Sequence, residues 1–506
     1  MSDEANKAKS RVPFALIVAI GILALAIIAW FKGYVNFGSV KGLLAFIFIL
    51  GAAVVIHEFG HFIVAKLLKI RVETFSVGFG PRLWGRKWGT TDYRVSAIPL
   101  GGYVKLGGDE SNAPIEGEGA TDIPPEEQFM LRPRWQKFLV AVAGPVMNIL
   151  TALMIPLVGG LMYGVPVTPT SPIVIKVFPD SAAQIADIRQ GDRIVAFNGT
   201  DNPSWDDISG DALVVPDKPE PLSLTIERDG ERIQKTITPK VRRINNESIG
   251  ELGLLPDYGE VPVLISSVSE SSPAAKAGLQ ADDRIIAING ERVRNSEEAR
   301  QLIRNYTGDH LHLTVERQGK QVEVDSELSR VKDDEGKEIA QLGVKLGEVL
   351  PREKVGVIGS ASFAWYDNLR ILRLTGKALG QLFAGQRSAR NTLSGPIGIY
   401  EAASTSVNEA GWAGIFGMLG FLSLSLGIFN LLPIPVLDGG AIFLLLVEAI
   451  LAVGGWKLSM RVRERIQQVG FVLLLLLMGF VITNDLLKKV SRNSDENKPQ
   501  VTATPK

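Results

Sequence analysis

Residues 41–66 read KGLLAFIFILGAAVVIHEFGHFIVAK, an apolar segment that carries two histidines and a glutamate in its second half. An α-helix rises about 1.5 Å per residue, so a segment of this length can cross the hydrocarbon core of a bilayer, which is about 30 Å thick. Ionisable side chains at membrane depth are costly to place and usually have a function. The segment therefore predicts a transmembrane helix with a functional site inside it.

His57 and His61 are four residues apart and share one face of the predicted helix, where both imidazoles can bind one metal ion. Glu58 lies one position further round, where its carboxylate can act on a water molecule at the metal instead of binding the metal. The alternative is a pair of core histidines that have helical spacing by chance. We expect a zinc site.

The composition limits the class of protein and of metal site. The chain has 506 residues, with 54 Lys and Arg against 54 Asp and Glu, and this zero net charge argues against a nucleic-acid-binding protein. A hydrophobic content of 46% indicates membrane spans together with a sizeable water-soluble part. Cysteine is absent and four histidines are present, so a carboxylate or amide elsewhere must complete any site built on His57 and His61.

Further apolar runs predict about five spans in all. They cover residues 12–31, 138–163, a broken region from 411 to 453, and 469–482. The first run resembles a signal peptide, but it is long and lacks a small-residue cleavage site, so we expect an uncleaved anchor. Basic residues gather in the N-terminal tail and in segments 66–137 and 457–465. The positive-inside rule then predicts a cytoplasmic N-terminus and an outer location for residues 164–410.

The outer segment contains an internal repeat. SAA at 181–183, GDRI at 191–194 and NG at 198–199 recur as SPAA at 272–275, DDRI at 282–285 and NG at 289–290. Alternating apolar strands between tight turns predict small β-rich modules. The second copy closely resembles a PDZ domain, and the first does so less, because Asp187 stands where the second copy has Gly278. PDZ domains bind extended chain ends, so the modules are peptide sensors or a filter against bulky outer domains, and we expect the filter.

Two other features of the outer segment carry weaker expectations. His310 and His312 are taken to lie on opposite faces of one strand and are not expected to share a metal. Segment 363–384 alternates apolar residues with Arg370, Arg373 and Lys377. This pattern predicts an amphipathic helix on the outer surface of the membrane, or else a plain linker helix.

Two glycine-rich, strand-like segments, residues 75–81 and 93–105, lie between the second and third spans. Such β structure can dip toward the bilayer where protein covers its backbone groups; an ordinary surface hairpin is the alternative. We hypothesise that an exposed edge pairs with the substrate and holds it extended for cleavage. The candidate substrate-binding residues here are Val77, Gly78, Phe79, Gly101, Gly102 and Tyr103.

Residues 427–440, GIFNLLPIPVLDGG, break an apolar run with two prolines and a Gly-Gly pair. At membrane depth such breaks surround a protein-lined or wet cavity. Asp438 is the candidate third zinc ligand, which leaves the fourth position to water. Its alternative role is the N-cap of a helix that starts at Gly439. Glu448 is the alternative third ligand, although no motif surrounds it.

Together these motifs resemble the site-2 protease family, and within it the bacterial regulator-of-sigma-E branch. The resemblance covers about residues 41–490 and rests on HEFGH at 57–61, NLLPIPVLDG at 430–439, GFG at 78–80 and the tandem PDZ insert. It implies a zinc endopeptidase of the bacterial inner membrane, with one zinc per chain. Its partners would be the lipid bilayer and single-span substrates that receive a second cut, namely anti-sigma factors and, as further candidates, remnant signal peptides.

The resemblance also implies roles by position. His57, His61 and Asp438 would bind zinc, and Glu58 would be the catalytic base. Asn430 would hold the substrate backbone or the developing oxyanion, and we place Pro433 and Pro435 beside it as substrate-binding residues. The alternative from another class is a PDZ scaffold that is anchored by its spans and has no catalytic activity.

The expected fold class is a polytopic α-helical membrane protein with a membrane-associated β-hairpin region and two tandem PDZ-like domains. Its parts are an extra N-terminal span (1–40), a first catalytic membrane half (41–163), PDZ-like domains (164–252 and 253–350), an amphipathic helix region (351–410), a second catalytic membrane half (411–490) and a disordered tail (491–506).

Overall fold

The computed structural model describes residues 40–108, 122–167, 172–244, 247–256, 261–332, 338–348, 352–455 and 459–496. The span expected at residues 12–31 lies outside the described residues. The chain forms two compact units: unit 1 comprises residues 1–157 and 393–506, and unit 2 comprises residues 158–392. Each unit is described by itself below.

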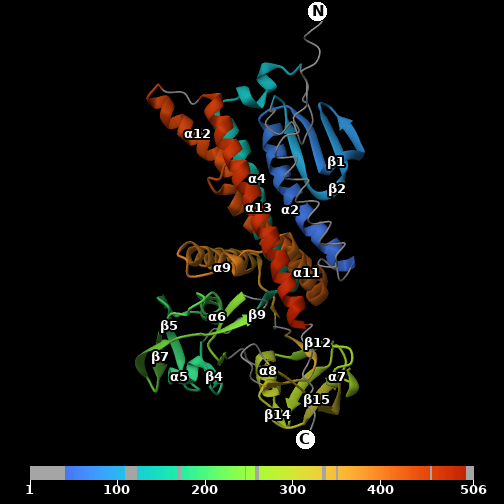
Figure 1. Cartoon of the computed structure of the whole chain (residues 1–506), viewed down its shortest axis with the longest axis vertical. Helices are drawn as coiled ribbons and strands as arrows, with labels where there is room; N and C mark the ends of the chain where they lie inside the picture. The colour runs from blue at the N-terminus through green and yellow to red at the C-terminus, as the bar shows by residue number, and fades with distance from the viewer. Residues whose placement is uncertain are drawn as a thin grey trace, which may run out of the picture. The chain divides into compact units, whose positions relative to one another are not determined.

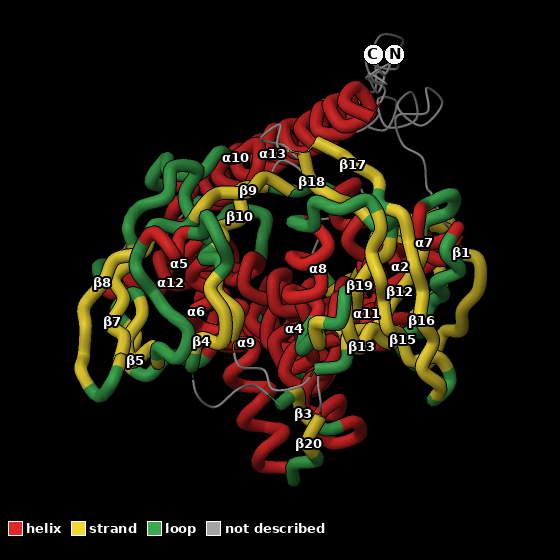
Figure 2. The backbone as a smooth tube through the Cα atoms, turned by 90° about the horizontal axis from the view of Figure 1, so that it is seen from below, coloured by secondary structure: helices red, strands yellow, loops and turns green. Residues whose placement is uncertain are grey.

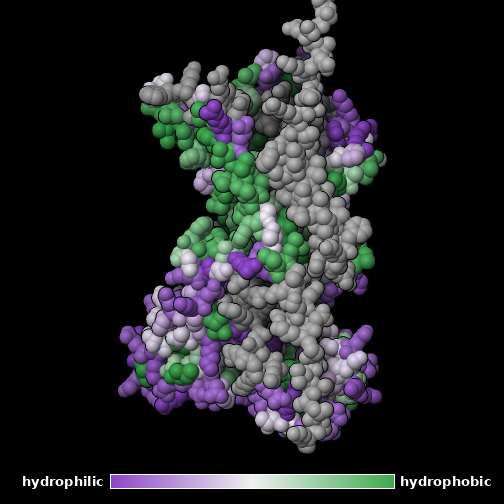
Figure 3. Space-filling view, in the orientation of Figure 1, coloured by the Kyte–Doolittle hydropathy of each residue, from purple (hydrophilic) through white to green (hydrophobic). Residues whose placement is uncertain are grey.

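Unit 1 is built on apolar helices (Figure 1). Within the described residues, four helical segments are long and apolar enough to cross a membrane: α2 (Val40–Leu67), α4 (Arg134–Tyr163), α11 (Pro396–Leu431) and Arg465–Lys488 of α13 (Met460–Glu496). They match the expected second, third, fourth and last spans. Hydrophobic residues cover much of the visible surface over α12 and the middle of α13 in Figure 3, as expected for lipid-facing helices.

The broken apolar region consists of two helices. Helix α11 bends at Gly411, whose φ is 55°, and ends at Leu431; helix α12 runs from Asp438 to Val453. The two prolines and the Gly-Gly pair therefore mark a real interruption, as their positions predict. Helix α13 continues to Glu496, so the tail expected to be disordered from residue 491 is helical as far as that residue.

Helices α2 and α11 pack through small and branched side chains. Ala45, Ile49 and Ala53 of α2 are buried with a matching set on α11: Ala403, Ile415 and Leu419. Small residues let two membrane helices approach closely, which increases dispersion contacts where the hydrophobic effect gives little help.

The segment after α2 forms the expected hairpin, of β1 (Val72–Trp88) and β2 (Thr91–Leu106). Its register shifts several times, and Val77 pairs with both Gly102 and Val95, so the two long strands fold into a bent sheet. Gly78 has a φ of 92°, and a Cβ there would lie 2.8 Å from the carbonyl oxygen of Ile98. Only glycine fits that bend.

Unit 2 contains two β modules with the same order of elements (Figure 2). In the first they are β4 (Val174–Val177), α5 (Ala182–Ile185), β5 (Arg193–Phe197), β6 (Thr200–Asp201), α6 (Trp205–Leu213), β7 (Leu222–Arg228), β8 (Glu231–Ile237), β9 (Lys240–Ile244), β10 (Glu247–Glu251) and β11 (Leu254–Pro256). In the second they are β12 (Val263–Val268), α7 (Pro273–Lys276), β13 (Arg284–Ile288), β14 (Glu291–Arg292), α8 (Ser296–Arg304), β15 (His310–Arg317), β16 (Lys320–Glu327), β17 (Ser329–Lys332), β18 (Glu338–Gln341) and β19 (Val344–Glu348). Strand β11 pairs with β4, so the first module continues past residue 252.

The repeat extends to single contacts. A buried aspartate accepts two hydrogen bonds from an arginine in each copy, Asp192 from Arg228 and Asp283 from Arg317, with Nε–Oδ1 distances of 2.7 Å in both. Burial alone would raise the pKa of Asp283, but the Arg317 hydrogen bond outweighs it and lowers that pKa. Asp187 has a φ of 54° where Gly278 has a φ of 81°. The aspartate thus adopts the same left-handed conformation, which Asp tolerates better than most residues.

The expected placement of His310 and His312 is wrong. Both lie on the exposed face of β15, while Leu311 between them is buried. Side chains alternate along a strand, so residues two apart share a face. His312 bonds Asp325 and Glu323 on the neighbouring strand β16, and the Asp325 hydrogen bond raises the pKa of this imidazole.

The segment expected as an amphipathic helix is α9 (Val357–Phe383). Its basic residues pair with the acidic face of α6: Arg370 with Asp206, Arg373 with Asp207, and Lys377 with Asp211, at 2.7–3.1 Å. Trp365, Tyr366 and other large apolar side chains of α9 are exposed. The positive charges therefore hold the helix on the first module. A short helix, α10 (Ala389–Thr392), and the pair β3 (Val165–Pro166) and β20 (Arg352–Glu353) complete the unit.

Candidate metal centre and active site

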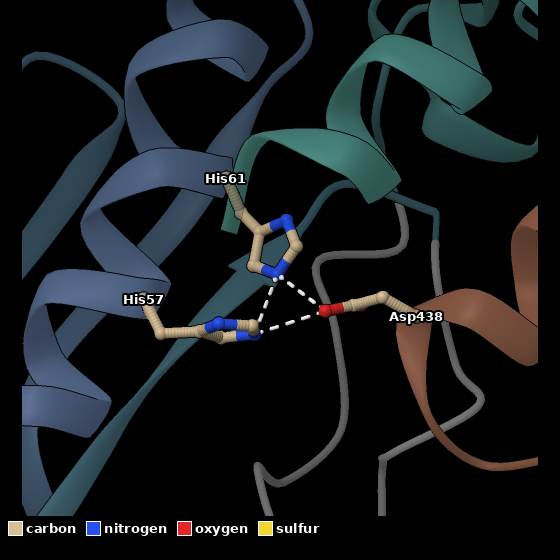
Figure 4. A group of neighbouring side chains, drawn as sticks. All are labelled: His57, His61 and Asp438. Atoms are coloured by element: carbon tan, nitrogen blue, oxygen red, sulfur yellow. Dashed lines mark hydrogen bonds and ion pairs between the residues drawn. The ribbon is translucent and has the colours of Figure 1, made fainter. Parts of the chain in front are cut away.

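Helix α2 presents its two histidines to one point in unit 1 (Figure 4). Both side chains are buried, and their Nε2 atoms are 3.2 Å apart. The rings meet edge to face at 83°, and the Nε2 atoms of both rings face the Asp438 carboxylate (Figure 4). The i, i+4 spacing on one helix produces this convergence, as the sequence predicted.

Asp438 completes the group from the start of α12. Its Oδ2 lies 2.9 Å from Nε2 of His57 and 3.4 Å from Nε2 of His61. The N-cap of α12 is Leu437, and Asp438 is the first residue inside the helix. Its carboxylate therefore does not cap the helix, and the side chain is free to point at the histidines.

The interruption before α12 brings the aspartate to this position. Gly439 and Gly440 pass so close to the preceding loop that a Cβ would lie 2.2 Å from the carbonyl oxygen of Leu432 and 2.3 Å from that of Ile434, respectively. Val436 has a φ of 86°, an unusual conformation for a β-branched residue. The Gly-Gly pair thus allows a tight reversal that places Asp438 at the first turn of the helix.

The donor set and its dimensions fit zinc. Two imidazoles and a carboxylate are the ligands of many catalytic zinc sites, and ligands bound tetrahedrally at about 2.0–2.1 Å stand about 3.3 Å apart. The three donor–donor distances here are 2.9, 3.2 and 3.4 Å. Within the described chain, this is the one group of three or more His, Asp and Glu side chains whose ligand atoms are close enough to share an ion. The residues present fit zinc in number, type and spacing.

Glu58 lies beside the group and is held by the hairpin. The main-chain N–H of Val104 in β2 donates to its Oε2 at 3.1 Å. This hydrogen bond fixes the carboxylate on the histidine side of α2 without using the ligand atoms. A carboxylate in this position can accept and return a proton next to a metal.

The structure separates the remaining candidates. Gly78, Gly101, Gly102 and Tyr103 are buried, while Val77 on β1 and Ile98 and Leu100 on β2 are 37–49% exposed. Phe79 is half-buried and stacks on Tyr103. Asn430, at the end of α11, is half-buried, and of the two prolines Pro433 is exposed and Pro435 packs on Gly470. Glu448, the alternative ligand, pairs with Arg463 and Arg134 and is not part of the histidine group.

Helix α4 makes contacts with both histidines that the sequence analysis did not anticipate. Nδ1 of His61 lies 2.7 Å from the carbonyl oxygen of Val140, and Nδ1 of His57 lies 3.3 Å from the side-chain amide of Asn148. The available signal was the polar Asn148 within an apolar span, since such residues are rarely placed without a partner.

Comparisons with known proteins identify the family of this chain. The family model described as peptidase family M50 matches residues 45–477. The chain belongs to peptidase family M50. The family is that of the site-2 proteases, so this M50 protein is a zinc metalloprotease, as its motifs predicted.

Several curated M50 relatives span nearly the whole chain. The regulator of sigma-E protease RseP of Escherichia coli (strain K12) is 33% identical over 461 residues, which cover 88% of this chain and 98% of the relative. RseP of Salmonella typhimurium (strain 14028s) is 32% identical over 458 residues, with the same coverage. A protein of Pasteurella multocida named as a zinc metalloprotease is 33% identical over 460 residues, again with 88% and 98% coverage.

Among solved structures, the PDZ domain of an SdrC-like protein from Listeria monocytogenes covers 17% of this chain and 85% of its own length, at 28% identity. Its TM-score is 0.15, too low to compare the folds.

Proposed function

We propose that this M50 protease makes the second cut in single-span membrane proteins, with His57, His61 and Asp438 as zinc ligands and Glu58 as the catalytic base. The observation that carries the proposal is the triangle of donor atoms, whose sides of 2.9–3.4 Å suit one tetrahedral ion. His57 and His61 lie on α2, which is long and apolar enough to cross a bilayer. Asp438 begins α12, which follows the candidate span α11. Cleavage would therefore take place at membrane depth.

The proposed mechanism follows from the positions of the side chains. Zinc at this site would acidify a water molecule and polarise the scissile carbonyl. Glu58, held by the N–H of Val104, accepts the proton of the attacking water and then donates it to the amine of the leaving segment. Asn430 lies in the last turn of α11, and the loop of Pro433 and Pro435 joins that helix to Asp438, so these residues are the proposed contacts of the substrate backbone.

The β-hairpin is the proposed guide for the substrate. A substrate helix hides its carbonyl groups in its own hydrogen bonds, so it must unwind before it can be cut. Val77 on β1, and Ile98 and Leu100 on β2, offer exposed apolar side chains to an extended chain, and β2 is also the strand that holds Glu58. Pairing along this part of the hairpin would keep the unwound segment extended.

The two β modules of unit 2 are proposed to be PDZ domains that exclude substrates with bulky outer domains. Basic residues in the N-terminal tail and in segments 66–137 and 457–465 support a cytoplasmic N-terminus, which puts the modules outside the inner membrane. The names of the Escherichia coli and Salmonella relatives point to sigma-E regulation. The proposed substrates are therefore anti-sigma-factor-like proteins already trimmed outside, together with remnant signal peptides.

A cleavage assay tests the proposal. The purified full chain in lipid is given single-span reporters that share one span and differ in the size of the outer domain. We expect cleavage of the short reporters and a steep fall as the outer domain grows. Equal cleavage of all reporters would show that the PDZ modules do not act as a size filter. If no reporter is cleaved, a membrane-anchored PDZ scaffold without catalytic activity describes the protein better.

A further inference from the structure

Helix α4 packs against α2 so closely that its backbone forms one wall of the candidate metal centre. A Cβ on Gly60 of α2 would lie 2.3 Å from the carbonyl oxygen of Ala143. A Cβ on Gly144 of α4 would lie 2.4 Å from Nε2 of His61 and 2.8 Å from Cε1 of His57. Both imidazoles therefore lie directly on the backbone of α4 at Gly144, where a side chain would displace them.

The residues four before and four after Gly144 contact the outer nitrogens of the same rings. Val140 offers a carbonyl oxygen 2.7 Å from Nδ1 of His61. A carbonyl can only accept a hydrogen bond, so Nδ1 of His61 carries the proton. The lone pair of a neutral His61 is then on Nε2, the atom that faces Asp438.

Asn148 occupies the matching position for His57. Its side chain is completely buried, with Nδ2 3.3 Å from Nδ1 of His57 and with Oδ1 left without a partner. A buried amide oxygen without a hydrogen bond is costly. A half-turn of the amide about its last side-chain bond brings Oδ1 to Nδ1 of His57, where Oδ1 accepts the Nδ1–H and the Nε2 lone pair of His57 faces Asp438.

We propose that Asn148 is a positioning residue of the metal centre, whose side-chain oxygen accepts the Nδ1–H of His57 as the carbonyl of Val140 accepts the Nδ1–H of His61. One face of α4 thus holds both imidazoles in the tautomer and orientation that present Nε2 to a metal. The inference rests on the proposed ligand set. Such outer partners of metal-binding histidines commonly change metal affinity about 10- to 100-fold when they are removed.

Zinc affinity of the purified full chain in detergent, measured by competition with a chelator, tests this role. Asn148→Leu keeps the size of the side chain and removes the acceptor, and we expect zinc to bind about 10- to 100-fold more weakly. Asn148→Asp keeps an acceptor and removes the donor, so it should stay within about threefold of the wild-type chain. Thr151→Val is the matched control, because Thr151 is one turn further along α4 and its hydroxyl bonds its own helix at Met147.

The visible absorption spectrum of the Co²⁺-substituted protein gives a second readout, because it reports the geometry of the ligands. It should change in Asn148→Leu and return toward wild type in Asn148→Asp. Asn148→Ala replaces the leucine variant if that chain does not accumulate.

Each outcome decides one claim. Wild-type zinc affinity in Asn148→Leu, or an equal loss in Asn148→Asp and Asn148→Leu, overturns the positioning role. Wild-type affinity in His57→Ala overturns the proposed ligand set instead, so the two failures are distinguishable.

Discussion

Val104 of β2 donates its main-chain N–H to the carboxylate of Glu58 on α2, at 3.1 Å. The hydrogen bond joins residues 46 apart in sequence and connects the hairpin to the candidate base. The β-hairpin thus has two roles in this account, since it holds the base and offers an edge beside it.

Replacing Val104 with proline should lower cleavage without loss of zinc. Proline removes the N–H that Glu58 accepts, and a base that is no longer held should act about tenfold more slowly. The measurement is the rate of reporter cleavage together with zinc content. Val104→Thr keeps the main-chain N–H and a β-branched side chain, and it should behave as wild type. Equal rates in both variants would mean that the hydrogen bond has no part in catalysis.

Glu58→Gln should retain zinc and lose most of its activity. The amide has nearly the shape of the carboxylate but cannot accept the proton of water, and general-base catalysis contributes about 10²- to 10⁴-fold. Reporter cleavage and zinc content are measured on the same preparation. Loss of zinc in this variant would place Glu58 among the ligands, whereas near-normal turnover would remove it from the mechanism.

Leu100→Pro should slow cleavage by about tenfold while zinc content stays unchanged. Leu100 is exposed and lies in the part of β2 between Ile98 and Gly102 that does not pair with β1. Proline there removes a main-chain donor from the proposed substrate edge. The control is Leu83→Pro, because Leu83 is also exposed and lies at another register shift of the hairpin. Unchanged cleavage in Leu100→Pro would contradict the pairing of substrate with this edge.

Asp207→Asn should loosen α9 at neutral pH but not in acid. Burial would raise the pKa of Asp207, but hydrogen bonds from Ser204 and Arg373 outweigh it and hold the pKa below its usual range. A carboxylate whose pKa is lower in the folded state stabilises the fold at pH values above its unfolded pKa of about 3.9. This stabilisation is lost as the pH falls through the pKa of the folded state. Because the side chains of Asp207 and Arg373 are both partly exposed, we expect their ion pair to stabilise the docked helix by only about 1 kcal/mol.

Amide hydrogen exchange in residues 357–383 measures this effect. The variant should exchange about fivefold faster than wild type at pH 7, and the difference should shrink below about pH 4. Asp201→Asn changes an exposed carboxylate of the same module and serves as the control. A difference that persists at low pH would show that the charge of Asp207 does not hold the helix.

Local pattern predicted much of the fold and of the candidate site. The apolar runs at 41–66 and 138–163 became α2 and α4, because a run of that length has few alternatives in a membrane. Helical spacing placed His57 and His61 together, and the breaks around Asp438 indicated where a second part of the chain meets them. In each case the physical cause lies within one short segment of sequence.

Contacts between distant segments were not predictable in this way. Nothing in the spacing of Arg370, Arg373 and Lys377 indicates that they pair with α6. The bonds of Val104 to Glu58, and of Val140 and Asn148 to the histidines, depend on how helices and strands pack, since their partners are 46 to 91 residues away. The placement of His310 and His312 failed for a different reason, namely a wrong application of strand alternation.

The zinc content of the purified chain shows whether Asp438 completes the metal site of His57 and His61. Elemental analysis is made on the wild-type chain, on Asp438→Ala and on Glu448→Ala, each checked for an intact helical spectrum. We expect one zinc per chain in the wild type and in Glu448→Ala, and almost none in Asp438→Ala, because two histidines alone hold zinc weakly. A full complement of zinc in Asp438→Ala would contradict the account.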